Sequence, residues 1–147
     1  MTKAQIRKNL IKKRSKIEGY SPQNDQTLDS DVLTLFWTQK TTEKMKNLGT
    51  YMPEFDDEIK RYAAFLAEYE LLSPLVKGPE DIKTSSAAGT EKTSPIVRML
   101  ENLRKDIMQE EDKILLTARE YYKLFPPEGT GEDKAERLQN ILEKIKG

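Results

Sequence analysis

Apolar side chains recur every three or four residues along most of the chain, the spacing that places them on one face of an α-helix. The clearest case lies between residues 54 and 72, where aliphatic and aromatic residues keep this spacing throughout. No strand of ordinary length is predicted. The pattern therefore predicts an all-α fold, with helices over residues 2–18, 29–48, 54–72, 95–115, 118–124 and 132–146.

Local signals define the ends of these helices. Gly49 follows the second helix, where a left-handed C-terminal cap is favoured. Ser94-Pro95 combines a capping hydroxyl with proline at the first helical position, which predicts a helix start. Thr117 and Glu120 have the spacing of a capping box. The short link between the second and third helices predicts that these two pack as an antiparallel pair.

The order of these elements suggests three regions. Residues 1–20 form a basic N-terminal arm or helix, and residues 28–125 form a helical core domain. Within that core, residues 73–93 are expected to be an exposed, mobile loop with a brief extended piece near Ile82. Residues 126–147 are interpreted as a hinge and a separate C-terminal helix. Its narrow apolar stripe is expected to bind a partner or a neighbouring subunit, through Leu138, Ile141, Leu142 and Ile145.

Composition excludes several kinds of chemistry. Only 36% of the residues are apolar and 34% are charged, which suits helices that each bury one stripe, or subunits that bury more in an oligomer. Cysteine and histidine are both absent, so the chain has no disulfide, no thiolate metal site and no Ser-His or Cys-His nucleophile. No apolar run approaches the length of a membrane span, so a soluble, cytoplasmic protein without a membrane partner is expected.

The net charge of zero conceals a basic N-terminal region. Residues 1–18 hold seven basic side chains and one acidic one. Such a segment favours contact with the phosphates of nucleic acid, but a solubilising tail or a helix paired with acidic protein surface explains the charge equally well. The candidate DNA-binding residues are Lys3, Arg7, Lys8, Lys12, Lys13, Arg14 and Lys16.

No catalytic residue, metal site or cofactor is predicted. The acidic runs 56–58 and 110–112 are the candidates for metal ligands, but consecutive residues on a helix point in different directions and do not converge. There is no glycine-rich phosphate loop and no dinucleotide fingerprint. Most aromatic residues lie on helical stripes, which indicates core packing over base stacking. A non-catalytic binding or assembly protein is expected.

From residue 36 onward, the chain carries a series of landmarks in a defined order. An aromatic helix ends at Leu48-Gly49, and an aspartate-containing turn leads to an alanine- and tyrosine-rich helix at 61–69. A glycine-containing loop then closes on Ser94-Pro95. The last landmark, at 116–124, is a basic restart. This order of landmarks resembles the small-subunit family of phage packaging terminases, although Ala118 replaces the usual proline and Tyr121 stands where an arginine is common.

The resemblance implies a subunit that forms a homo-oligomeric ring in the host cell cytoplasm. Such a ring would bind double-stranded viral DNA and deliver it to a large subunit that holds the ATPase and nuclease. Two other functions fit the residues: a helical structural or adaptor phage protein, and a DNA-binding transcriptional regulator. The acidic start of the helix at 54–58 argues against the regulator, because it is a poor probe for a DNA groove.

Overall fold

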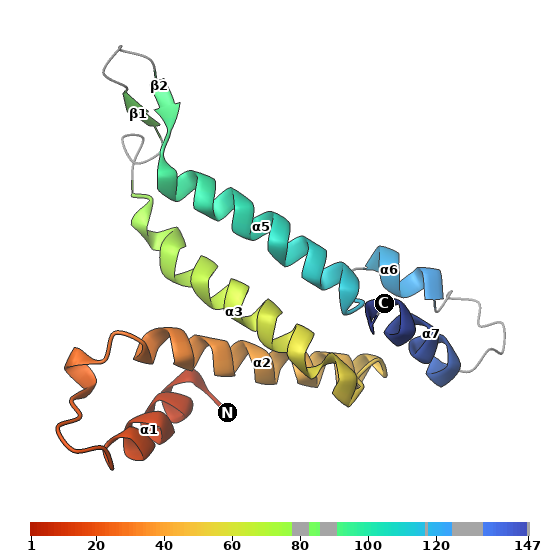
Figure 1. Ribbon diagram of the computed structural model, residues 1–147, viewed down its shortest axis with the longest axis horizontal. Coiled ribbons are helices and arrows are strands. Elements are labelled where there is room, and N and C mark those ends of the chain that lie inside the picture. Colours follow the sequence, from red (N-terminus) through yellow and green to blue (C-terminus); the bar gives the residue numbers. More distant parts are fainter. Residues whose placement is uncertain (78–82, 86–90, 117, 125–133, 147) are drawn as a thin grey trace.

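The computed structural model describes residues 1–77, 83–85, 91–116, 118–124 and 134–146 (Figure 1). It confirms the all-α fold class, with one small two-stranded sheet as an addition. None of the described helices is both long and apolar enough to cross a bilayer. The α-helices are α1 (Lys3–Arg14), α2 (Leu28–Leu48), α3 (Asp56–Leu72), α5 (Pro95–Lys113), α6 (Ala118–Leu124) and α7 (Lys134–Lys146).

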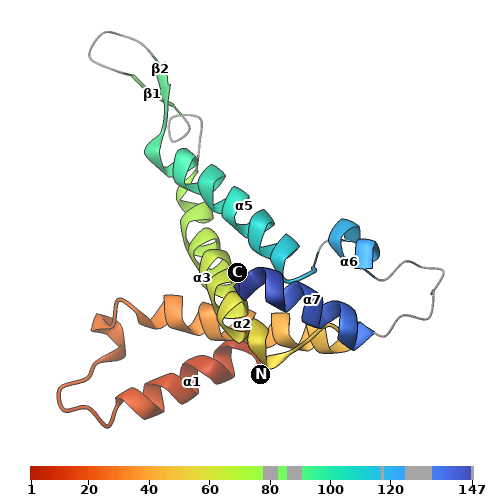
Figure 2. The same cartoon turned by 45° about the vertical axis from the view of Figure 1, so that its right-hand side comes forward.

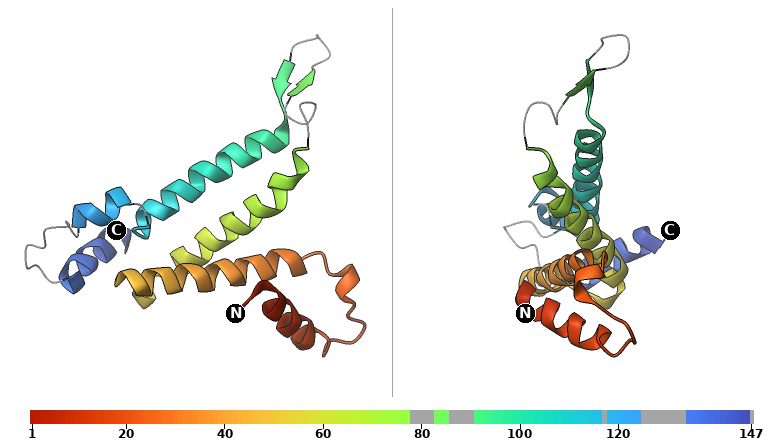
Figure 3. Two further views of the ribbon diagram at one scale, coloured as in Figure 1. Left: turned by 180° about the vertical axis from the view of Figure 1, so that it is seen from behind. Right: turned by 90° about the vertical axis from the view of Figure 1, so that its left-hand side faces the viewer.

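The second and third predicted helices pack against each other as α2 and α3 (Figure 3). Gly49 ends α2 in the left-handed conformation, with φ at 75°, which residues with a side chain rarely adopt. The chain then turns through a 3₁₀ helix, Pro53–Phe55, before α3 begins. The two helices run in opposite senses, as the views of Figures 1 and 3 show.

Helices α3 and α5 form a second packed pair (Figure 2). A 3₁₀ helix, Ser73–Leu75, continues α3, and a short antiparallel hairpin stands beyond the far end of the pair. Its strands are β1 (Lys83–Ser85) and β2 (Glu91–Thr93), with Thr84 opposite Lys92. The expected extended piece near Ile82 corresponds to β1, although Ile82 itself lies outside the described residues. Residues 86–90 of the loop that was expected to be mobile also lie outside them.

The main core lies where α2, α3 and the end of α5 meet. Met45 and Phe55 are completely buried there, and Ile59 and Tyr62 contribute from α3. Ile114 and Leu115, which follow α5, close the cluster from the other side. This is the largest apolar cluster among the described residues, and it determines how the helices are arranged.

Helix α7 also belongs to this core, and this corrects the expectation of a separate C-terminal helix bound to a partner. Leu138 and Leu142 are only 4% and 6% exposed, and both pack in the main cluster. Ile141 and Ile145 lie against the cluster but remain partly exposed. The physical reason is that the stripe of α7 finds apolar surface within its own chain. The proposed hinge at 128–131 lies outside the described residues.

A second, smaller apolar cluster holds α1 on the first half of α2. Ile6 is buried against Leu28 and Val32, and Leu10, Ile11 and Phe36 surround them. The predicted helix to residue 18 is too long, because α1 ends at Arg14. Ile17 lies beyond the end of α1 and is exposed.

Other sequence predictions hold only in part. Helix α5 begins at Pro95 as expected, but the Ser94 side chain makes no capping hydrogen bond. Met99 of this helix is exposed. Helix α6 starts where the capping box predicts, although Thr117 itself lies outside the described residues.

Candidate nucleic-acid interface

Helix α1 forms at the N-terminus because its first residues satisfy its own backbone. The Thr2 hydroxyl accepts a hydrogen bond from the Gln5 backbone N–H at 3.2 Å, and the Gln5 side chain accepts one from the Thr2 backbone N–H at 2.9 Å. This reciprocal pair is a capping box, which stabilises the first turn of a helix. The last turn contains Lys12, Lys13 and Arg14, and the helix dipole favours cations at that end.

Three of the seven basic residues of this region are bound to acidic residues of the same chain. Arg7 pairs with Asp29 at the start of α2. Lys3 lies 2.6 Å from a carboxylate oxygen of Glu70 on α3. Arg14 pairs with two carboxylates, as described next. These ion pairs attach α1 to the rest of the protein and neutralise the three cations, although Arg7 itself stays exposed.

Arg14 is the centre of a hydrogen-bonded cluster at the C-terminal end of α1. Its guanidinium donates to Asp25 at 2.7 Å and also to Asp31, so it joins the connecting loop to α2. The Tyr20 hydroxyl donates to the same Asp25 carboxylate at 2.8 Å, and Thr27 donates from its backbone N–H. The hydrogen bonds from Tyr20 and Arg14 hold the pKa of Asp25 well below its usual range, so this carboxylate stays ionised.

Glu70 holds the other end of α1. One of its carboxylate oxygens accepts from Lys3, and the other accepts the indole N–H of Trp37 at 2.8 Å. Burial opposes ionisation of Glu70, but the hydrogen bonds from Lys3 and Trp37 outweigh it and lower the pKa of the carboxyl. The Lys3 ammonium also lies 5.0 Å from the centre of the Phe36 ring, within the range of a cation–π contact.

The other four basic residues, Lys8, Lys12, Lys13 and Lys16, have a different setting. All four are exposed, and among the described residues none of them makes an ion pair or a hydrogen bond. Lys8, Lys12 and Lys13 belong to α1, which lies at the edge of the molecule (Figures 1 and 3), and Lys16 follows just after its end. This lysine face, defined by these four residues, is the part of the predicted site that can contact an anionic polymer.

The acidic runs show no sign of a metal centre. Within the described parts of the chain, no three acidic side chains lie together in a way that would hold a metal ion. Glu110 of α5 is buried beside Glu58 of α3, and burial and then this neighbour raise the pKa of its carboxyl. Arg61 and Lys113 lie 3.5 Å and 3.4 Å from one Glu110 oxygen, which partly offsets that rise.

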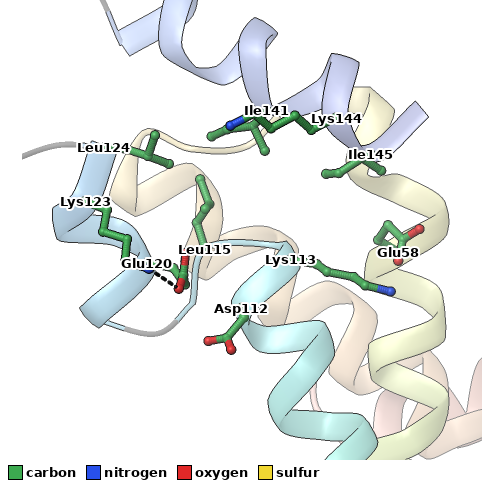
Figure 4. A pocket seen from close by; sticks show the side chains of 10 residues that line it. All are labelled: Glu58, Asp112, Lys113, Leu115, Glu120, Lys123, Leu124, Ile141, Lys144 and Ile145. Atoms are coloured by element: carbon green, nitrogen blue, oxygen red, sulfur yellow. Dashed lines mark hydrogen bonds and ion pairs between the residues drawn. The ribbon is translucent and has the colours of Figure 1, made fainter. Parts of the chain in front are cut away.

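A cavity of about 650 Å³ opens between the C-terminal elements (Figure 4). Leu115, Ile141 and Ile145 form part of its apolar wall. The charged residues around it are balanced, with the lysines Lys113, Lys123 and Lys144 opposing the acids Glu58, Asp112 and Glu120. Glu120 accepts a hydrogen bond from Lys123 within α6, as drawn in Figure 4. Because the charges balance, the cavity lining favours the binding of neither an anion nor a cation.

Sequence reasoning grouped seven basic residues, and the structure divides them into two sets. The division depends on Asp25, Asp29, Asp31 and Glu70, which the sequence analysis did not assign to the site. Asp25, Asp29 and Asp31 follow the arm closely, so their proximity was a usable signal, whereas Glu70 is 67 residues from Lys3. Comparison with protein-family models, curated proteins and solved structures gives no match for this chain.

Proposed function

We propose that this chain is a non-catalytic, DNA-binding protein, and specifically the small subunit of a phage DNA-packaging terminase. The observation that carries the proposal is the lysine face of α1. Three exposed ammonium groups without an acidic partner among the described residues lie on α1, and that of Lys16 follows just after the helix. The helix is fixed to the protein by its remaining cations. Phosphates of double-stranded DNA are the natural counter-charge for such a surface.

The assignment to a terminase rests on the landmarks between Phe36 and Leu124 that resemble that family. It implies a homo-oligomeric ring in the host cell cytoplasm, in which the lysine faces of several subunits bind one duplex and reinforce one another by avidity. The ATPase and nuclease would belong to the large subunit, and this chain would need no cofactor of its own. Contact with the large subunit is assigned to the open part of the α7 stripe, Ile141 and Ile145.

The DNA-binding part of the proposal is tested by the salt dependence of affinity for a mixed-sequence duplex. Each phosphate neutralised on B-DNA changes the slope of log K against log salt by about −0.9, so four contacts predict a slope of about −3.6 for each bound chain. Changing Lys8, Lys12, Lys13 and Lys16 together to glutamine should remove most of that slope and most of the affinity. The control changes the same number of exposed cations elsewhere: Lys44, Lys60, Arg98 and Lys105 to glutamine.

Point changes are preferable to removal of the arm. Deleting α1 would uncover Leu28 and Val32, and the resulting instability would be difficult to separate from loss of phosphate contact. Equal affinities and slopes for the wild-type and α1-substituted proteins would refute the proposed interface. Loss of affinity in the control variant alone would transfer the binding surface to α2, α3 and α5.

The terminase assignment is tested separately by mass in solution, measured by light scattering with and without duplex DNA at low and moderate salt. A ring-sized oligomer that takes up DNA is the expected result. A dimer that binds DNA would favour the transcriptional regulator. A monomer or dimer indifferent to DNA would favour the structural adaptor and would make the lysine face a solubilising surface.

A further inference from the structure

One exposed side chain on α1 has a chemistry different from that of the lysines around it. Asn9 is followed one turn later by Lys12 and Lys13, the positions that lie nearest to it on the helix surface. Its side chain is exposed, and its amide nitrogen lies 3.6 Å from the Met1 sulfur, which is a weak acceptor. Its amide is therefore not held by any strong hydrogen bond within the described residues.

Gln5 lies on the same side of α1 but differs from Asn9. Its side-chain oxygen accepts the Thr2 backbone N–H, so that oxygen is already used to cap the helix. Within the described residues the Asn9 amide oxygen accepts no hydrogen bond, and its amide nitrogen donates only to the weak Met1 sulfur acceptor, which an outside ligand can displace. An asparagine amide is complementary to the N6 and N7 edge of adenine in the DNA major groove, whereas a lysine ammonium on a phosphate carries no sequence information.

The position of α1 permits a close approach to DNA. Its described packing is against α2 on one side, and the opposite side is open to solvent at the edge of the molecule (Figure 2). The B-DNA major groove, about 12 Å wide, admits a single helix. Ion pairs from Lys3, Arg7 and Arg14 hold α1 in place, which gives an exposed amide the fixed orientation that base recognition needs.

We infer that α1 enters the major groove and that Asn9 is a sequence-specificity residue, which contacts a base edge with adenine as the favoured base, while Lys12 and Lys13 contact the flanking phosphates. The inference rests on the proposed DNA-binding function and adds sequence selectivity to it. A good bidentate contact of this kind is worth about 1–3 kcal/mol of discrimination, which corresponds to about 5- to 150-fold between the favoured and the wrong base.

The test uses the full-length protein and a pool of duplexes with a randomised central region. Bound duplexes are recovered and sequenced in parallel for the wild-type protein, for Asn9→Ala and for Lys12→Ala. The wild-type protein should enrich adenine at one position, and Asn9→Ala should lose that enrichment. Because asparagine carries no charge, the salt slope of Asn9→Ala should match that of the wild-type protein. Lys12→Ala should keep the enrichment and reduce the slope by about 0.9.

Three outcomes separate this inference from the function beneath it. Salt-dependent binding without any enrichment by the wild-type protein would overturn the role of Asn9 and leave phosphate binding by the lysine face intact. The same motif enriched by the wild-type protein and by Asn9→Ala would assign the base contact to another residue and also overturn the inference. Absence of duplex binding by the wild-type protein would overturn both the inference and the proposed function.

Discussion

The indole N–H of Trp37 on α2 donates a hydrogen bond to a carboxylate oxygen of Glu70 on α3, 2.8 Å away, while the second oxygen of Glu70 accepts from Lys3 on α1. One carboxylate thus joins three helices. The ion pair with Lys3 is partly exposed, whereas the hydrogen bond to Trp37 satisfies a part-buried donor. The two contacts can be separated experimentally, because glutamine retains an acceptor for Trp37 and removes the charge.

Replacing Glu70 by glutamine should therefore lower the free energy of unfolding by about 0.2–1 kcal/mol, the range for a partly exposed ion pair. Replacing it by alanine also leaves the Trp37 N–H without its partner and should cost about 1–3 kcal/mol more. Chemical denaturation gives both values. Trp37 is the only tryptophan in the chain, so its fluorescence reports directly on this contact. Equal losses for the two variants would show that the Trp37 hydrogen bond contributes nothing.

The burial of α7 in the main core gives a second prediction. Leu138→Ala or Leu142→Ala should lower the free energy of unfolding of the isolated protein by about 2–5 kcal/mol, the range for removal of a buried leucine side chain. The exposed neighbour Gln139 is the matched control, and its change to alanine should be nearly neutral. Equal free energies of unfolding for all three variants would show that α7 is not part of the core. They would support the expectation that its apolar stripe binds a partner.

The cluster around Asp25 predicts an acid dependence of stability. Because hydrogen bonds lower the pKa of Asp25 in the folded protein, the stability that it contributes is present above the unfolded pKa of about 3.9 and is lost as the pH falls toward the folded value. Asp25→Asn cannot ionise and lacks this contribution at every pH. The stability difference between the wild-type protein and this variant, measured by urea denaturation, should narrow as the pH is lowered from 6 to 2.5. A constant difference would contradict the prediction.

Glu110 predicts the opposite pH dependence. Burial, followed by the neighbouring Glu58, raises the pKa of its carboxyl, so the folded state holds its proton at a pH where the unfolded state has lost it. Stability should therefore fall as the pH rises from about 4.3 through the folded pKa. Glu110→Gln removes the charge but keeps the shape, so its stability should fall less over this pH range. The stability of the variant relative to the wild-type protein should therefore be higher at pH 8 than at pH 5. Arg61 and Lys113 limit the effect, and a variant less stable than the wild-type protein at pH 8 would show that these two cations outweigh burial.

The end of α2 and the start of α5 were predictable because their signals are local. Gly49 occupies the left-handed position that glycine favours, and Pro95 begins α5 where proline is tolerated. The placement of α7 was not predictable, because an apolar stripe does not reveal which surface will cover it. The division of the basic residues was only partly predictable, since Lys3 pairs with Glu70, whose proximity depends on how α2 and α3 fold together.

Helix α2 connects the two apolar clusters, with Leu28 and Val32 in the smaller one and Met45 in the larger. Between Val32 and Met45 the helix rises by about 20 Å, at about 1.5 Å per residue. Helix α2 therefore acts as a rigid spacer, with α1 packed at one end and the main core at the other. A tilt of about 10° at the crossing with α3 would displace α1 by roughly 3–4 Å over this length. Glu70 of α3, which accepts hydrogen bonds from both Trp37 of α2 and Lys3 of α1, opposes such a tilt and keeps α1 at a fixed distance from the main core.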